Sequence, residues 1–137
     1  MFFNKKDQTN ENFYLVRIGA LLIHAAKIDE EYSSDEEVII KKTLLELGVE
    51  DKNLDSIMNE AKNIEKKSNQ ILEFTKEVKK MDKQEKDKIV ESLWKIIYSN
   101  KDADMYEANL MRRLAGLLYV DNKTMGDIKE KIKKENL

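Results

Sequence analysis

The segment DEEYSSDEEVIIKKTLLELGV, residues 29–49, has a counterpart later in the same chain. It aligns without a gap with NKDADMYEANLMRRLAGLLYV, residues 100–120. Polar and acidic residues open both segments, a glutamate follows at the same place in each (Glu36 and Glu107), and an apolar helical pattern comes after it. Another apolar helical pattern leads into each segment. We interpret the pair as an internal repeat of a helix–loop–helix unit.

Each segment predicts a helix that begins with a capping box. Ser33 and Asp104 are residue types that favour the N-cap position, and a glutamate follows each of them three residues later. In a capping box this glutamate accepts a hydrogen bond from the backbone amide of the cap residue. Capping therefore accounts for Ser33, Glu36, Asp104 and Glu107 without any metal ion.

Both glutamates also occupy an unusual place for a carboxylate. At about 100° of rotation per residue, Glu36 and Glu107 each head the apolar stripe of their helix instead of its polar side. A carboxylate there needs amide donors, a cation or a proton. Two interpretations stay open: the glutamates are caps and nothing more, or they are caps that also contact a metal ion or a buried basic group.

The second segment begins with NKDADMYE, residues 100–107, in which oxygen-bearing side chains alternate. This is typical of the start of an EF-hand calcium loop, but that loop also needs glycine at its sixth position and glutamate at its twelfth. Counted from Asn100, those positions hold Met105 and Met111. The EF-hand interpretation is therefore excluded. We call residues 29–36 the first hinge and residues 100–107 the second hinge.

Helical spacing of apolar residues recurs along the whole chain. The first helix, expected at about 10–28, is apolar around most of its circumference, which is typical of a helix at the centre of a bundle. Gly48 is expected to end the second helix, and the stripe residues Phe74 and Trp94 are expected in the core. The other helices are expected at about 34–47, 54–64, 71–81, after a cap at Asp82 with Glu85, at 105–119 and at 127–135.

The predicted fold class is all-α. We expect a single compact bundle of about seven helices, and no segment alternates as a strand would. One domain spans 1–137, with the repeat motifs at 21–49 and 94–120. Residues 1–9 are expected to form a flexible arm.

Composition limits the class of protein. The chain has 137 residues with no proline and four glycines, and 41% of the residues are hydrophobic, which suits one helical domain. Lys plus Arg number 25 against 27 Asp plus Glu, so we expect no nucleic-acid binding through a general basic surface. The most apolar stretch, IGALLIHAA, is far shorter than the roughly 20 residues that span a bilayer. With no cysteine and no signal-peptide pattern, we expect a cytoplasmic protein.

The chain around the two hinges resembles the TerB-like family, which includes the tellurite-resistance B proteins and the N-terminal domain of a membrane-linked DnaJ co-chaperone. The segments that carry the resemblance are IHAAKIDEEYSSDEEVIIKKTLLELGV and WKIIYSNKDADMYEANLMRRLAGLLYV. The family pattern is an alanine-rich helix, Asp-Gly, a glutamate seven residues after the Asp, and an apolar helix. Both segments fit this spacing. The resemblance implies an all-helical stress-associated protein with no established enzymatic activity.

The resemblance also implies that acidic residues bind a divalent metal ion, of the calcium or magnesium type. The chain departs from the family pattern, because Glu30 and Lys101 replace the glycine that follows the Asp in each segment. The second Asp is itself replaced by Asn100, a weaker ligand. The residues at the candidate metal sites are Asp29, Glu36, Asn100, Asp102, Asp104 and Glu107.

Three functional hypotheses follow. The first is a non-enzymatic TerB-like module that binds a divalent cation or a protein partner in a stress-related pathway, with a second copy of the chain among the candidate partners. The second is a structural interaction domain whose acidic hinges are helix caps without metal. The third is an enzyme with paired carboxylates, which would need an open pocket containing both hinge glutamates. The sequence shows no second type of catalytic group beside them.

His24 is the only histidine of the chain. It lies on the narrow polar strip of the first helix with Arg17 and Lys27. We interpret it as a polar-edge residue near a helix C-terminus. One histidine and no cysteine also exclude a typical zinc site, which needs several such ligands.

Overall fold

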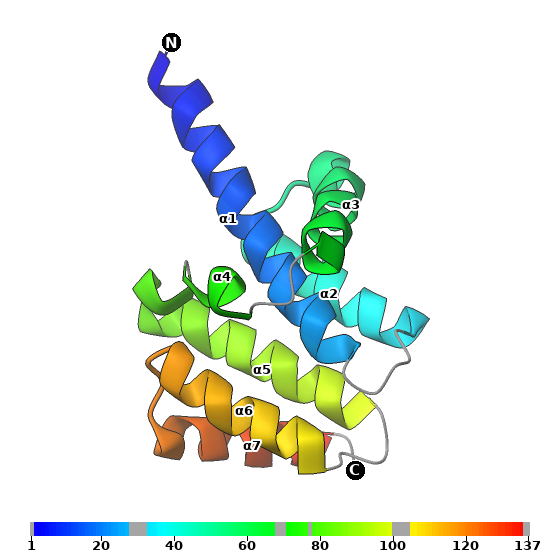
Figure 1. Ribbon diagram of the computed structural model, residues 1–137, viewed down its shortest axis with the longest axis vertical. Helices are drawn as coiled ribbons and strands as arrows, with labels where there is room; N and C mark the ends of the chain where they lie inside the picture. Colours follow the sequence, from blue (N-terminus) through cyan, green and yellow to red (C-terminus); the bar gives the residue numbers. More distant parts are fainter. Residues whose placement is uncertain (1, 28–32, 68–70, 77, 100–104, 136–137) are drawn as a thin grey trace.

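The described part of the chain is helical almost throughout. The structure, a computed structural model, describes the backbone of residues 2–27, 33–67, 71–76, 78–99 and 105–135. Within these ranges there are seven α-helices, one short 3₁₀ helix and no β-strand, which confirms the predicted all-α bundle (Figure 1). The elements are α1 (Phe2–Ala26), α2 (Ser34–Glu46), α3 (Asp51–Lys67), α4 (Ile71–Thr75), η1 (Val78–Lys80), α5 (Lys83–Ser99), α6 (Met105–Leu117) and α7 (Asn122–Glu135).

The central helix is α1, as its apolar circumference predicts. It packs against α2, α3, α4 and α5. Between Leu15 and Ala26 every residue is buried except Arg17 and His24, which are half-buried. Because neighbouring helices cover most of its circumference, polar side chains fit only along a narrow strip.

The start of α1 differs from the prediction. The helix begins at Phe2 instead of near residue 10, so residues 2–9 are helical. This stretch contains neither glycine nor proline, so nothing in it breaks a helix. In Figure 1 the first turns of α1 project beyond the other helices. The predicted start was wrong because it rested on the apolar pattern, which begins only where the helix enters the bundle.

The prediction of one continuous helix over 71–81 was also wrong. The structure has the five-residue α4 followed by the 3₁₀ helix η1. Phe74, Thr75 and Val78 are all buried. Phe74 and Val78 are therefore buried as the apolar stripe predicts, although the backbone between them is not one continuous α-helix.

Two helices end with the same hydrogen-bond pattern. After α2 the amide of Val49 donates to the carbonyl of Leu44 over 3.0 Å, and after α6 the amide of Val120 donates to the carbonyl of Ala115 over 3.0 Å. Each is the long-range bond of a Schellman motif. The two valines are aligned with each other in the two matching sequence segments. The two helices therefore end in the same way at aligned positions, and the internal repeat stays a prediction.

The same motif requires a left-handed residue just before each valine. That residue is Gly48 after α2, with φ of +112°, and Tyr119 after α6, with φ of +57°. Glycine adopts positive φ without steric cost, so the prediction that Gly48 ends the second helix is confirmed. Tyrosine does not share this freedom, since its Cβ crowds the backbone.

Aspartates begin two further helices. Asp82 Oδ1 accepts a hydrogen bond of 2.9 Å from the amide of Glu85, which confirms the predicted cap of α5. The carboxylate of Glu85 accepts a bond of 3.0 Å from the hydroxyl of Tyr14, and so ties α5 to α1. Asp121 Oδ1 accepts a bond of 2.7 Å from the amide of Thr124. This cap explains why α7 begins at Asn122, before the predicted residue 127.

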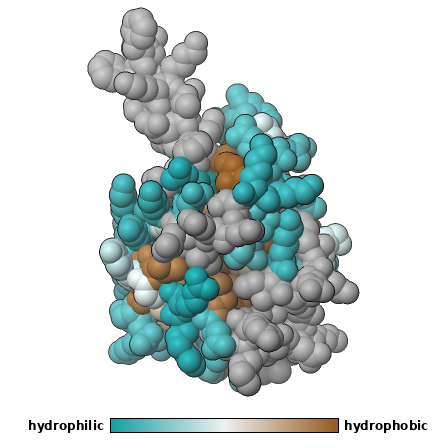
Figure 2. Space-filling model, in the orientation of Figure 1, coloured by the Kyte–Doolittle hydropathy of each residue, from teal (hydrophilic) through white to brown (hydrophobic). Residues whose placement is uncertain are grey.

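The core lies between α1 and the helices around it. Phe74 and Trp94 are both buried, as predicted, and Trp94 lies where α5 meets α6 and α7. Lys129 of α7 places its ammonium group 5.5 Å from the centre of the Trp94 ring. Hydrophilic side chains cover most of the described surface seen in Figure 2, and apolar side chains show only between them. Among the described helices, none combines the length and the hydropathy that crossing a membrane requires.

The helix ends that flank the two hinges lie at one end of the molecule. In Figure 1, α1 and α5 end on the right of the view, and α2 and α6 begin there. The opposite end gathers η1, the start of α5, the end of α6 and the start of α7. The molecule therefore has a hinge end and a distal end.

Candidate functional site

The first helix turn of α2 contains a complete capping box. Ser33 is the N-cap in an extended conformation, with φ of −90° and ψ of 163°. Its hydroxyl accepts a hydrogen bond of 3.2 Å from the amide of Glu36, and its own amide donates to Glu36 Oε1 over 2.9 Å. Both halves of the predicted reciprocal pair are present. The prediction that Ser33 and Glu36 form a cap is confirmed.

Glu36 is also buried, as its place on the apolar stripe predicts. Its side chain is only 4% exposed. Ile40 and Thr43, which follow it along the same face of α2, are buried as well. Burial of a carboxylate costs free energy unless polar partners compensate it, and the Ser33 amide is one such partner. The hinge end thus holds a carboxylate that the fold takes out of solvent.

A neighbouring glutamate links α2 to α3. Lys62 Nζ donates to Glu37 Oε1 over 2.7 Å. This hydrogen bond and the lysine charges hold the pKa of Glu37 below its ordinary value, although desolvation opposes them. Glu37 is therefore ionised at neutral pH, and its ion pair with Lys62 holds α2 against α3. It differs from Glu36, which faces the core side of the same helix turn.

The remaining predicted ligands lie mostly outside the described residues. Glu107 is within α6, but its side chain is not among the described ones. Among described residues, no group of three His, Cys, Asp or Glu side chains is arranged to hold a metal ion. The predicted ligands outside the described backbone are Asp29, Asn100, Asp102 and Asp104.

Glu65 is a buried carboxylate that the sequence analysis did not single out. It is 9% exposed, and its Oε2 accepts a hydrogen bond of 2.8 Å from Lys27 Nζ. Nδ1 of His24 lies 3.5 Å from its other oxygen. The sequence could have indicated this burial, because Glu65 falls four residues after Ala61 on the apolar stripe of α3.

This cluster refines the interpretation of His24. The histidine is half-buried near the C-terminus of α1, and its ring lies 6.3 Å from the ring of Phe74, centre to centre. Lys27 and Glu65 complete an α1–α3 contact at the hinge end of α1. The cluster supplies one buried carboxylate and a pairing lysine. It therefore joins two helices and does not assemble a set of metal ligands.

A cavity of about 370 Å³ lies between α2 and α5. The hydroxyls of Thr43 and Ser92 are hydrogen-bonded to each other in its wall. Glu91, also in the wall, lies 3.6 Å from Lys95 and 3.4 Å from Lys131. Positive and negative side chains are balanced around it, and Glu36 is not among its lining residues. The cavity is thus separate from the capped carboxylate.

The geometry defines a helical bundle with an acidic, capped hinge and a buried hinge carboxylate. Comparison with protein families matches residues 16–130 to the family described as tellurite resistance protein TerB. The chain belongs to this family, as the resemblance in the two hinge segments predicted. Comparison with curated proteins and with solved structures gave no match.

Proposed function

We propose that this chain is a non-enzymatic TerB-type module of a tellurite-related stress response, and that it acts by binding a divalent cation at its hinges or a protein partner. The observation that carries the proposal is Glu36: a member of the TerB family has a carboxylate buried at the first turn of α2. A buried carboxylate is costly to maintain for capping alone, since exposed residues make the same cap. We place the protein in the cytoplasm, in keeping with its lack of cysteine.

The chemistry of the hinge residues suits a hard cation. Calcium and magnesium prefer carboxylate and amide oxygens, which all six proposed ligands carry. The Ser33 amide contacts Oε1 of Glu36, and a carboxylate has two oxygens that can accept hydrogen bonds or bind a cation. The ligands would be Asp29 and Glu36 at the first hinge and Asn100, Asp102, Asp104 and Glu107 at the second. A bound cation would stabilise the carboxylate that the fold has removed from water.

The capping box itself favours a second function. Because Ser33 and Glu36 satisfy each other's amides, they account for the first hinge without a cation. In that case the chain is a structural interaction domain, and its acidic hinges are helix caps only. The two functions differ in one measurable respect, since only the first makes stability depend on a cation.

Thermal unfolding separates the two functions. Midpoints are measured in chelator and then in excess calcium, magnesium, manganese or zinc. A cation at about a hundred times its dissociation constant stabilises by about 2.7 kcal/mol, which is several degrees for a domain of this size. The proposal predicts such a shift with one hard cation. Equal midpoints in chelator and in all four metals would favour the structural function.

Two variants show whether a shift comes from the hinge. Glu36→Gln keeps a side-chain acceptor for the Ser33 amide, because glutamine also serves in a capping box. It should abolish the cation shift while the midpoint in chelator stays close to wild type. Ser33→Ala removes the cap and keeps the carboxylate, so in chelator it should lower the free energy of unfolding by about 1 kcal/mol, and it should preserve the cation shift. A cation shift that survives in Glu36→Gln would place the ion elsewhere.

A further inference from the structure

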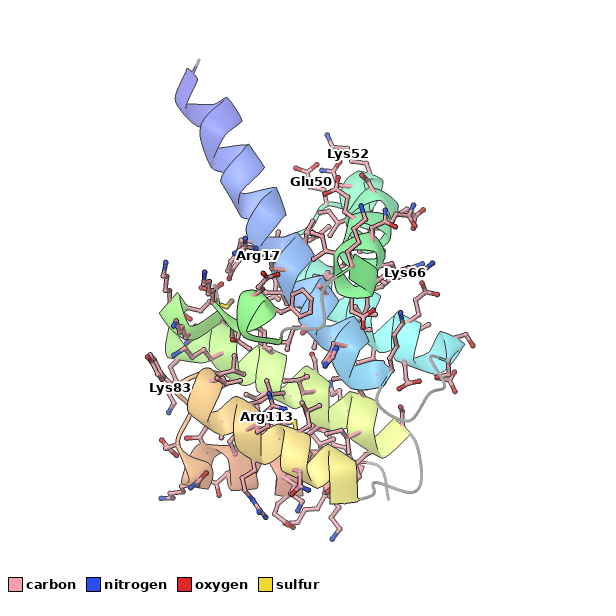
Figure 3. All side chains as sticks on the ribbon, in the orientation of Figure 1. Arg17, Glu50, Lys52, Lys66, Lys83 and Arg113 are labelled. Atoms are coloured by element: carbon pink, nitrogen blue, oxygen red, sulfur yellow. The ribbon has the colours of Figure 1, made fainter. Side chains whose placement is uncertain are left out.

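An exposed tyrosine and three lysines form a surface at the distal end of the molecule. Tyr119 follows α6, Lys79 belongs to η1, and Lys83 and Lys86 lie in the first turns of α5. Figure 3 labels Lys83 at this end of the bundle. A cavity of about 220 Å³ opens here between the start of α5 and the turn that leads into α7. We call these four residues the Tyr119 surface.

The backbone of Tyr119 is held in a conformation that disfavours tyrosine. Its φ of +57° is left-handed, which costs an L-residue roughly 1–2 kcal/mol. The matching turn after α2 has glycine at this place, Gly48. The two turns share the same Schellman bond, so the fold requires the backbone conformation but does not require the tyrosine.

Packing does not explain the tyrosine either. The side chain of Tyr119 is 72% exposed, so it gains little from the core in return for the backbone cost. A large side chain kept exposed at a strained position is typical of functional sites. Aromatic residues that combine an apolar body with a polar tip are also enriched where proteins bind each other.

The charges around the ring are positive and concentrated. The ammonium groups of Lys79 and Lys86 lie 5.7 Å and 5.8 Å from the centre of the Tyr119 ring. Neither lysine has a carboxylate within ion-pair distance in the described part of the chain. Two ammonium groups directed at one ring repel each other, and an anionic group between or beside them would relieve this repulsion.

Two aspartates line the same cavity and contribute negative charge to it. Asp121 already accepts the amide of Thr124 as the cap of α7, and Lys83 and Lys123 lie close enough to favour its ionised form. Asp87 lines the cavity on the α5 side. These two carboxylates offset part of the lysine charge, and Lys79 and Lys86 remain directed at the exposed ring.

We propose that the Tyr119 surface is a docking site for an acidic peptide segment of a partner protein, with an apolar side chain of the segment resting on Tyr119. Lys79 and Lys86 complement aspartates and glutamates of the segment. The exposed ring and the cavity beside it give an apolar side chain a contact that a simple anion would not need. The inference rests on the protein-partner part of the proposed function and is independent of the hinge cation, because it uses the opposite end of the bundle.

The test uses a synthetic peptide as the probe. A short fluorescein-labelled peptide of aspartate and glutamate around one central phenylalanine is titrated with the full chain, and binding is followed by fluorescence anisotropy at low and at high salt. Binding should weaken as salt screens the lysine charges. A matched peptide with alanine in place of phenylalanine should bind more weakly. Equal binding of both peptides would identify a general anion surface and overturn the proposal.

Variants test the residues of the surface without unfolding the chain. Tyr119→Gly removes the ring but suits the left-handed backbone, and it should weaken binding about tenfold or more. Lys79→Gln combined with Lys86→Gln should have a similar effect. Lys133→Gln combined with Lys134→Gln, at exposed positions near the end of α7, removes the same charge elsewhere and should leave binding unchanged.

The remaining outcomes separate this proposal from the hinge proposal. No peptide binding at low salt would overturn the docking site, as would equal losses in the two lysine double variants. Glu36→Gln should bind the peptide as the wild type does, and Tyr119→Gly should keep any cation shift in thermal unfolding. A cation shift without peptide binding would thus refute the docking site alone, and peptide binding without a cation shift would refute the hinge site alone.

Discussion

Gly19 should tolerate alanine poorly, because α1 and α3 approach each other there. A Cβ placed on Gly19 would lie 3.0 Å from the Cβ of Ala61 and 3.7 Å from a methyl group of Leu44. The leucine methyl can rotate away. The Cβ of Ala61 cannot, because it is attached directly to the backbone of α3, so relief requires one of the two helices to shift.

Two opposing effects determine the size of the change in Gly19→Ala. Alanine in place of glycine favours a helix interior by about 1 kcal/mol. Overpacking of a close core contact costs about 1–3 kcal/mol. We therefore expect a net loss of up to about 2 kcal/mol in the free energy of unfolding. Gly126→Ala in α7 is the matched control, since a Cβ there meets no atom within 4 Å and should stabilise by up to about 1 kcal/mol.

The assay is urea unfolding followed by the fluorescence of Trp94, the single tryptophan. A cycle with Ala61→Gly measures the contact directly, because the double variant moves the methyl group from α3 to α1. The double variant should be more stable than the sum of the two single changes predicts, with a coupling of about 1 kcal/mol or more. If Gly19→Ala stabilised the protein as much as Gly126→Ala does, the close approach of α1 and α3 would be refuted.

Two further predictions concern the helix ends and the α2–α3 ion pair. Both turns require positive φ, so Gly48→Ala should lower the free energy of unfolding by about 1–2 kcal/mol, whereas Tyr119→Gly should raise it by up to about 1 kcal/mol. Urea midpoints of the two variants that move in the same direction would contradict this. The pKa of Glu37 is lowered from 4.5, so its ion pair with Lys62 stabilises the fold above that value and is lost as pH falls through the lowered pKa. The difference in urea midpoint between wild type and Glu37→Gln should therefore shrink from about pH 6 to about pH 3, and a constant difference would rule out this role.

The local features of the hinge could be predicted from the sequence because they depend on few residues. A capping box needs only a serine and a glutamate three residues apart, and the structure contains both of its bonds at Ser33 and Glu36. The burial of Glu36 followed from the helical period, since the glutamate shares a face with Ile40 and Thr43. The metal ligands themselves stay a prediction, because a metal site depends on where several loop residues meet in space.

The sequence by itself determined the helical class, the central place of α1 and the caps at Ser33 and Asp82, since period, propensity and capping act over a few residues. Only the tertiary structure decided which polar groups meet across helices. Glu65 pairs with Lys27, and the Tyr119 ring lies close to the ammonium groups of Lys79 and Lys86. These residues are too far apart in the sequence for a local pattern to predict their contact. The break after α4 belongs to the same group, because Phe74 and Val78 are both buried as their spacing predicts and yet no continuous helix joins them.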